Sequence, residues 1–258
     1  MQAKDTISAA IRRANEAGRP AIVAFLTAGF PRRNEFLATL QQVAAAADVV
    51  EIGVPFTDPM ADGMTIQRSS RAALEQGVTL RWILESLAAA DRPRAPLLLM
   101  SYLNPLLAIG FESLPTLARD AGIAGFIIPD LPFEESGDVR ERLDAAGLAL
   151  VQLVTPVTPD DRLARLCAAS GGFVYAVTMT GTTGKSVEVP DDVLVYMDRV
   201  RQHATVPVCA GFGIRSSEQV ARMSGHVDGV IVGSALVEVL ERGEDPARFL
   251  LQLRPTVR

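Results

Sequence analysis

The chain of 258 residues is 48% apolar and 21% charged, which is ordinary for a folded globular protein and compatible with one α/β barrel domain or two smaller domains. Its net charge of −5 argues against a broad basic surface, so we expect no nucleic acid and no anionic membrane as a partner. No apolar stretch reaches the roughly 18 residues that span a bilayer, and residues 1–18 read as an amphipathic helix without a signal-peptide centre, which predicts a cytoplasmic protein.

Short apolar runs alternate with amphipathic segments along the whole chain. Each run is almost continuously apolar, without the polar and apolar alternation of a half-exposed strand, and is therefore typical of a parallel strand covered on both faces. In chain order, the predicted strands are 21–27, 48–54, 96–102, 125–130, 148–154, 172–178, 206–212 and 228–234.

The segments between these runs have helical periodicity. Residues 193–200, for example, place one apolar stripe toward a sheet. Gly122 and Gly147 fall where helices should end, and Ser216 is the predicted N-cap of the helix that follows it.

Eight strand and helix units predict a closed (β/α)8 TIM barrel. We expect a single domain over residues 1–258, with the additional N-terminal helix covering the barrel bottom. An open doubly wound sheet is the alternative. Such a sheet usually has fewer strands and a dinucleotide fingerprint, and no G-x-G-x-x-G follows the first predicted strand.

The cysteines and histidines do not form a pattern that suggests chemistry. Cys167 and Cys209 are isolated in apolar segments, as expected of small buried side chains. His203 and His226 lack the spacing of metal ligands, so we expect no metal site and no catalytic histidine. No Walker-type lysine motif is present, so a nucleotide is not implied.

Glycines cluster after the last two predicted strands, where barrel enzymes often hold phosphate. Gly211, Gly213 and Gly233 allow backbone N–H groups to approach an anion, and Ser234 can add a hydroxyl at a helix start. The alternative is that these glycines only make tight turns. Their coincidence at two adjacent strand ends favours a phosphate monoester site.

The loop 179–189 after the sixth predicted strand is long and rich in Gly and Thr. It is either a surface excursion or a mobile lid over the barrel. In a lid, Gly184 is a candidate phosphate contact and Thr183 a candidate contact with the catalytic end.

Glu51 interrupts an apolar run near the C-terminal end of the second predicted strand. If it points into a barrel mouth, desolvation should raise its pKa and let it act as acid or base near neutral pH. The apolar residues expected to line that mouth are Phe25, Met100, Ile127 and Phe212.

Asp62 lies beyond a turn and can supply a second, better hydrated carboxylate that stays ionised and accepts a hydrogen bond from a substrate N–H. In the structural alternative, Glu51 pairs with a backbone N–H or with Tyr102. Asp58 and Asp62 are then simple turn residues.

The segment EIGVPFTDPMADGMTIQ (51–67) resembles the signature of the tryptophan synthase alpha subunit family. This motif is long and specific. The resemblance continues in order, over almost the whole chain, through FLTAGFP (25–31), MSYLNP (100–105), PDLPFEE (129–135), FVYAVTMTGTTG (173–184), AGFGI (210–214) and VGSALV (232–237).

The resemblance implies a (β/α)8 barrel that cleaves indole-3-glycerol phosphate to indole and glyceraldehyde 3-phosphate. It also implies a beta subunit partner in an alpha2beta2 complex, which receives the indole through a tunnel. Pyridoxal phosphate is expected only in that beta subunit, with no cofactor or metal in this chain.

The resemblance also implies residue roles. Glu51 is the general acid/base, Asp62 holds the indole N–H, and Tyr175 supplies a nearby hydroxyl, while Thr183 meets Asp62 when the lid closes. The resemblance implies phosphate contacts at Gly184, Gly213, Gly233 and Ser234. The other substrate contacts that we expect are Phe25, Met100, Tyr102, Ile127, Thr183 and Phe212. The implied contacts with the beta subunit are Asp58, Asn104, Asp130 and Pro132.

Four positions depart from the family pattern. Pro is common where Met64 stands, Asp or Tyr where Phe30 stands, and Ser and Val where Thr178 and Thr182 stand. The first two affect loop geometry and the last two lid packing, and none removes a predicted catalytic group.

Two other functions are compatible with a barrel of this kind. One is a sugar-phosphate isomerase or epimerase that uses the same phosphate site. The other is a non-catalytic partner of a beta subunit, which would be expected to have lost Glu51, Asp62 or Tyr175. All three residues are present.

Overall fold

The computed structural model describes residues 2–178, 189–211 and 213–255, and within them eight parallel strands close into a barrel. Each strand pairs with its neighbours in sequence, and β1 pairs with β8 to complete the ring. The predicted closed barrel is confirmed. The strands are β1 (Ala21–Thr27), β2 (Val49–Gly53), β3 (Leu97–Met100), β4 (Ile123–Ile127), β5 (Ala149–Val154), β6 (Val174–Val177), β7 (Val208–Gly211) and β8 (Gly229–Val232).

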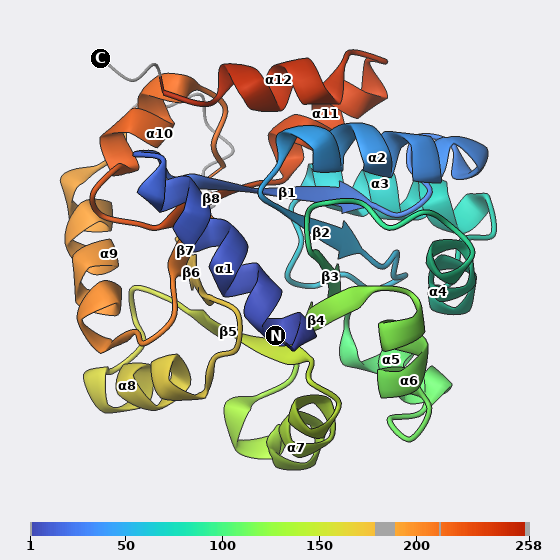
Figure 1. Ribbon diagram of the computed structural model, residues 1–258, viewed down its shortest axis with the longest axis horizontal. Coiled ribbons are helices and arrows are strands. Elements are labelled where there is room, and N and C mark those ends of the chain that lie inside the picture. Colours follow the sequence, from blue (N-terminus) through green and yellow to red (C-terminus); the bar gives the residue numbers. More distant parts are fainter. Residues whose placement is uncertain (1, 179–188, 212, 256–258) are drawn as a thin grey trace.

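Helices surround the barrel and connect one strand to the next (Figure 1). In the described residues, none is long and apolar enough to cross a membrane. The α-helices are α1 (Ala3–Glu16), α2 (Phe36–Ala46), α3 (Met64–Glu75), α4 (Leu80–Ala88), α5 (Leu103–Ile109), α6 (Leu114–Asp120), α7 (Gly137–Ala145), α8 (Asp160–Ala169), α9 (Asp191–His203), α10 (Ser217–Met223), α11 (Ser234–Glu241) and α12 (Pro246–Gln252). Two short 3-10 turns are η1 (Arg33–Glu35) and η2 (Phe133–Glu135).

Two apolar clusters lie on the two sides of the barrel wall, because successive residues of a strand point to opposite faces. Val23 and Val49 belong to the cluster inside the barrel, together with Leu98 and Cys209. The alternate residues of the same strands pack against the outer helices. The side of the wall on which a residue lies can therefore be read from its position along the strand.

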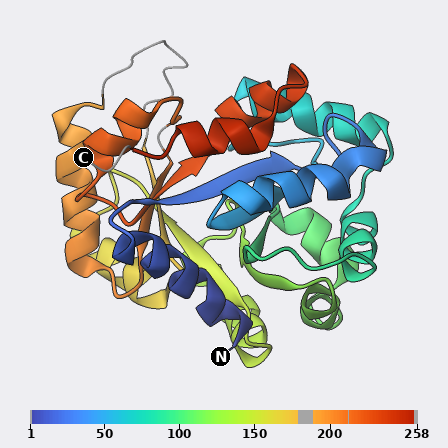
Figure 2. The ribbon, with the colours of Figure 1, turned by 45° about the horizontal axis from the view of Figure 1, so that its top comes forward.

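Helix α1 closes the N-terminal end of the barrel. The Ser8 hydroxyl donates to the Gly172 carbonyl, and the Asn15 amide donates to the Asp228 carbonyl at 2.8 Å. Both acceptors lie just before strands, and Ile11 of α1 is fully buried in the interior cluster. Figures 1 and 2 show α1 lying across the barrel. The predicted covering helix is confirmed, and the opposite end forms the mouth.

The predicted helix ends are also confirmed. Helices α6 and α7 are followed by Gly122 and Gly147, which take φ values of 74° and 72° that favour glycine. Ser216 caps α10 in a capping box with Gln219. The helices therefore stop where the next strand must begin.

The fourth strand differs from its prediction over 125–130, because β4 spans Ile123–Ile127. The turn at Gly122 lets the strand begin two residues earlier. Pro129 has no N–H group with which to continue the ladder, which favours an earlier end. Residues 128–130 consequently belong to the loop at the mouth of the barrel.

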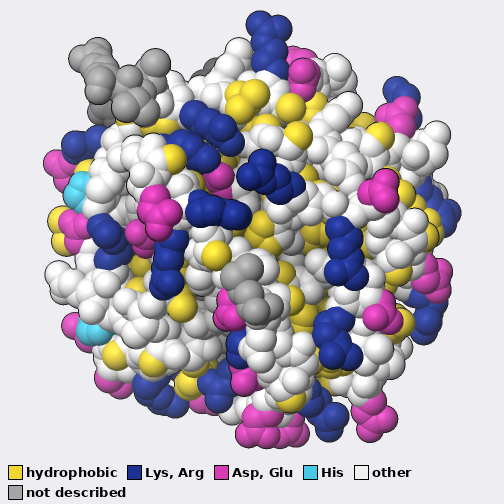
Figure 3. Space-filling view, viewed as in Figure 1, with side chains coloured by type: hydrophobic (Ala, Val, Ile, Leu, Met, Phe, Trp, Pro, Cys, Tyr) yellow, Lys and Arg dark blue, Asp and Glu magenta, His cyan; other side chains and the backbone are white. Residues whose placement is uncertain are grey.

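The surface at the α1 end carries charges of both signs. Figure 3 shows Lys and Arg side chains interspersed with Asp and Glu side chains across this face. The titratable side chains of Glu51, Asp62 and Tyr175 lie toward the opposite end of the barrel, where the strands end.

Candidate active site

Glu51 lies in the middle of β2 and points into the barrel. It shares its strand face with Val49, which belongs to the interior cluster, and its register neighbours are Phe25 on β1 and Leu98 on β3. The residue is 0% exposed, and among the described residues neither carboxyl oxygen has a hydrogen-bond partner. A buried polar group without a partner costs free energy in folding, so packing alone does not account for this residue.

The environment of Glu51 changes its ionisation. Burial, with a smaller contribution from the negative charge of Asp62, raises the pKa of Glu51 to about 8. The carboxyl group is therefore mostly protonated at neutral pH and can donate a proton. The structural alternative of a pair with Tyr102 is not observed, because the Tyr102 hydroxyl accepts the Ala61 N–H at 2.9 Å and hydrogen-bonds Asp62.

Asp62 lies in the loop between β2 and α3 and is half-buried. Burial raises its pKa to about 6, although the hydrogen bond with Tyr102 acts in the opposite direction. The side chain is better hydrated than Glu51, as predicted, but its pKa is not that of an ordinary surface aspartate. At pH 7 Asp62 is mostly ionised while Glu51 is mostly protonated.

Tyr102 and Gln67 hold the loop that carries Asp62. The Tyr102 ring stacks on Phe56 with centroids 5.0 Å apart, which places its hydroxyl against the Ala61 N–H and Asp62. The Gln67 amide donates to the Asp62 carbonyl at 2.8 Å. This packing orients the carboxylate, so Tyr102 supports Asp62, and its contact with substrate stays a prediction.

Tyr175 lies on the interior face of β6, beside Phe173 with ring centroids 6.2 Å apart. Burial and then the charges of Glu51 and Asp62 raise its pKa well above the ordinary value, so the hydroxyl stays protonated. A Cβ atom at Gly211 would lie 2.8 Å from the Tyr175 ring, so only glycine fits there. The structure therefore brings the three predicted catalytic side chains into one electrostatic environment.

Apolar side chains surround these groups. Phe25 is buried beside Glu51 on the neighbouring strand, Ile127 is buried in the interior cluster, and Met100 is half-buried against it. Leu153, half-buried on the interior face of β5, completes this wall and was not predicted. Side chains alternate along β5, so Leu153 shares the interior face with Val151, but both faces of the strand carry apolar residues and the sequence does not show which face is interior.

Gly213 follows β7 and Gly233 follows β8, at the two strand ends where a phosphate site is predicted. Gly213 is exposed with a φ of 70°, and added side-chain volume there would meet no atom within 4 Å. Gly233 precedes α11, whose first residue is Ser234, and in the described chain no side chain caps this helix start. The first N–H groups of α11 therefore lack a partner within the helix and suit an anion.

Three predicted contacts lie outside the described residues. Thr183 and Gly184 fall within 179–188, and Phe212 falls between the described ranges. Their predicted roles, and the departure at Thr182, stay predictions.

The other departures from the family pattern lie in ordered surroundings. Phe30 is buried after β1, and Met64 is the exposed first residue of α3. Thr178 follows β6, and its hydroxyl donates to the Gly211 carbonyl at 3.0 Å. None of the three displaces Glu51, Asp62 or Tyr175 from the mouth.

The four residues predicted to contact a partner are all exposed near the mouth. Asp58 lies on the loop after β2, Asn104 on α5, and Asp130 and Pro132 after β4. The Asp130 carboxylate accepts the Leu103 N–H at 2.9 Å and so joins two of these loops. The structure places the four residues in segments that follow β2, β3 and β4, three of them in loops and Asn104 in the first turn of α5.

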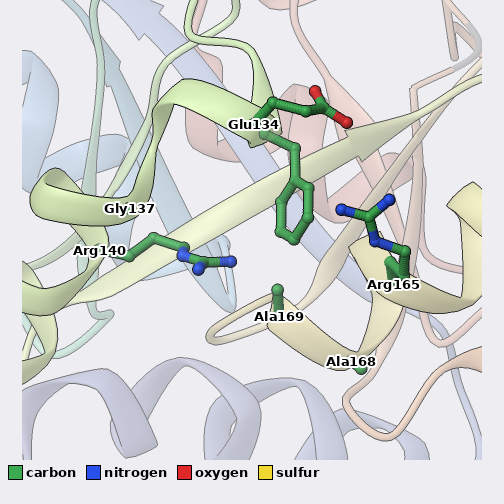
Figure 4. A pocket seen from close by; sticks show the side chains of 7 residues that line it. Glu134, Gly137, Arg140, Arg165, Ala168 and Ala169 are labelled. Atoms are coloured by element: carbon green, nitrogen blue, oxygen red, sulfur yellow. The ribbon is translucent and has the colours of Figure 1, made fainter.

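A separate hollow of about 530 Å³ lies on the outer ring, between η2, α7 and α8 (Figure 4). The Arg140 and Arg165 guanidinium groups lie 4.8 and 5.2 Å from the centroid of the Phe133 ring. Glu134 also lines the hollow and forms an ion pair with Arg162. This hollow contains none of the carboxyl groups with raised pKa values. The mouth is therefore the candidate active site.

The burial of Glu51 predicts a pH-dependent stability. Its folded pKa of about 8 lies above the ordinary 4.5, so the folded chain retains a proton that the unfolded chain releases. This stabilisation is complete below about pH 4.5 and lost as pH rises through 8, a change on the order of a few kcal/mol. Urea unfolding from pH 4.5 to 9 should show it as a falling difference between the parent chain and Glu51→Gln. Parallel curves for the two proteins would contradict the raised pKa.

The closed parallel barrel, with titratable groups at the C-terminal ends of its strands, is the architecture of the (β/α)8 barrel enzymes. A family model described as tryptophan synthase alpha chain matches residues 11–254. The chain belongs to the tryptophan synthase alpha chain family, which confirms the resemblance seen in the sequence.

Individual relatives are similar over nearly the whole length. The tryptophan synthase alpha chain of Nitratidesulfovibrio vulgaris (strain DP4) is 48% identical over 242 residues, covering 93% of this chain and 94% of the relative. A solved structure of Mycobacterium tuberculosis tryptophan synthase in space group F222 matches with a TM-score of 0.88 and 32% identity, covering 96% of each chain. The tryptophan synthase subunit alpha of Legionella pneumophila str. Paris matches with a TM-score of 0.86 and 28% identity, covering 98% and 97%.

Proposed function

We propose that the barrel mouth cleaves indole-3-glycerol phosphate to indole and glyceraldehyde 3-phosphate, with Glu51 as general acid and base. The observation that carries the residue assignment is the buried Glu51 carboxyl group, which has no hydrogen-bond partner among the described residues and whose pKa is about 8. Membership in the tryptophan synthase alpha chain family supports the reaction. Family members are lyases of this class.

The reaction begins with proton transfer to the indole ring. Protonated Glu51 donates to indole C3, which makes the bond from C3 to the glycerol chain labile and places positive charge on the ring nitrogen. Ionised Asp62 accepts the ring N–H and offsets that charge. The difference between the two pKa values, about 8 and about 6, gives each carboxyl group the protonation state that its role needs.

Cleavage then returns the proton to the enzyme. The glycerol hydroxyl next to the ring loses its proton to the Glu51 carboxylate, its oxygen forms the aldehyde, and the electrons of the broken carbon–carbon bond restore the indole ring. Glu51 is protonated again at the end of the cycle. Tyr175, whose hydroxyl remains protonated, donates a hydrogen bond to the reacting end of the substrate.

The phosphate group anchors the substrate at the glycine turns. Backbone N–H groups at Gly213 and Gly233, with the Ser234 hydroxyl at the start of α11, bind its oxygens, and Gly184 adds a further contact. Thr183, which lies outside the described residues, is the proposed contact of Asp62. Binding energy at this end holds the indole ring against Glu51.

The chain works in the cytoplasm as one catalytic domain in an alpha2beta2 complex. Asp58, Asn104, Asp130 and Pro132 contact the beta subunit, which holds pyridoxal phosphate and receives the indole. The exposure of these four side chains near the mouth supports this arrangement.

The direct test is to incubate the purified chain with indole-3-glycerol phosphate, with and without a beta subunit, and to follow indole. We expect release of indole from the chain alone and a faster release in the complex. Turnover of another sugar phosphate without indole would overturn the assignment.

The pH dependence of kcat/KM should be bell-shaped. Activity requires ionised Asp62, so it should fall below about pH 6, and protonated Glu51, so it should fall above about pH 8. The apparent values belong to the coupled pair. Steady-state rates from pH 5 to 9 check this expectation. A flat profile across pH 8 would contradict the role of Glu51 as the proton donor.

A further inference from the structure

One carboxylate on α11 joins three segments around the glycine turns. Glu238 accepts two hydrogen bonds from the Arg215 guanidinium, at 2.7 and 2.9 Å, and is 3.5 Å from the Thr65 hydroxyl on α3. The Arg215 side chain comes from the loop after β7. This two-bond geometry fixes the relative position of the groups more tightly than a single contact does.

The pair lies beside both halves of the predicted phosphate site. Glu238 is four residues after Ser234, so both lie on one face of α11, one turn apart. Arg215 is two residues after Gly213. The Arg215–Glu238 pair therefore connects the Gly213 turn to the helix whose N-terminus follows Gly233.

Both ends of the pair are held by further contacts. The Arg215 N–H donates to the Gln219 side chain at 2.7 Å, which anchors the loop on α10. The hydrogen bond from Arg215 lowers the pKa of Glu238, so this carboxylate stays ionised. The Glu238 side chain is 25% exposed, whereas the Arg215 side chain is 55% exposed.

We propose that Arg215 and Glu238 are positioning residues for the substrate phosphate, an inference that rests on the proposed function. Gly213 itself has no side chain, and the ion pair of Arg215, two residues further on, links this loop directly to α11.

The test compares this pair with a matched one. Arg215→Met and Glu238→Gln should each raise KM for indole-3-glycerol phosphate by about fivefold with kcat within about twofold, because substrate anchoring is lost and the chemistry is not. The double variant should be no worse than the worse single variant, and Arg215→Lys should be intermediate because lysine keeps the charge but not the fork.

Arg68 and Glu241 supply the control. They form an equally short two-bond pair, at 2.8 and 2.7 Å, between α3 and α11, and within the described residues this pair has no hydrogen bond to the loop after β7. Arg68→Met and Glu241→Gln should leave KM within about twofold. An equal rise of KM in both sets, or a fall of kcat alone in the Arg215 set, would overturn the inference.

A binding measurement separates this inference from the proposed function. Titration calorimetry with inorganic phosphate needs no turnover, so it reports on the glycine turns even if the parent chain releases no indole. We expect weaker phosphate binding in Arg215→Met and unchanged binding in Arg68→Met. Equal affinity in these two variants would refute the positioning role, whatever reaction the mouth catalyses.

Discussion

Glu51→Gln is expected to lower the rate of indole release by about 10²- to 10⁴-fold, which is the usual contribution of a general acid or base. Glutamine matches glutamate in size and fills the same buried position on β2, so the mouth keeps its shape. The amide cannot donate a proton to indole C3 or take one from the glycerol hydroxyl. Single-turnover measurement of indole at pH 7 checks this expectation directly.

The variant must be shown to keep its substrate site. Inorganic phosphate should bind Glu51→Gln as it binds the parent chain, because the glycine turns are on other strands. Glu85→Gln, an identical change at an exposed position on α4, should release indole at the parent rate. Unchanged turnover in Glu51→Gln would remove the residue from the catalytic machinery.

Asp62→Asn is expected to lower kcat by about 10²- to 10³-fold, the size of effect seen when charge stabilisation in a transition state is removed. The amide oxygen can still accept the indole N–H, and its hydrogen bond with Tyr102 can persist. What is lost is the negative charge that offsets the developing charge on the ring. Comparison of kcat with KM separates this loss from weaker binding.

The matched change for this position is Asp91→Asn, which removes an exposed carboxylate from the loop after α4. We expect parent activity in that variant. If Asp62→Asn were as active as Asp91→Asn, the position would supply a hydrogen bond and not a charge, and the mechanism would need another source of stabilisation.

The barrel could be predicted because its signals are local. Continuous apolar runs mark buried parallel strands, and Gly122 and Ser216 mark helix boundaries through backbone geometry and capping, which depend on few neighbours. That Glu51 belongs to the second strand was similarly visible, although it lies in the middle of β2 and not near its C-terminal end. Side chains alternate between the two faces of a strand, and in a closed barrel one of these faces is the interior, which is where Glu51 points.

Contacts between distant segments could not be predicted in the same way. Tyr102 could have paired with either carboxylate, and only the stacking on Phe56 and the fold of the loop decide for Asp62. The Arg215–Glu238 pair joins segments that no pattern in the sequence relates. Such contacts depend on the three-dimensional spacing of elements, which periodicity does not contain.

Helix α1 closes one end of the barrel, and this closure affects where the proposed product indole can leave. With α1 across the other end of the barrel, the mouth is the open end, and its rim includes the loops that bear Asp58 and Asp130. A protein seated on those loops would lie directly beside the site where the proposed product indole is released. A protein bound at that rim should therefore change the rate at which indole leaves. Substitutions in α1 should change the stability of the chain and not that rate.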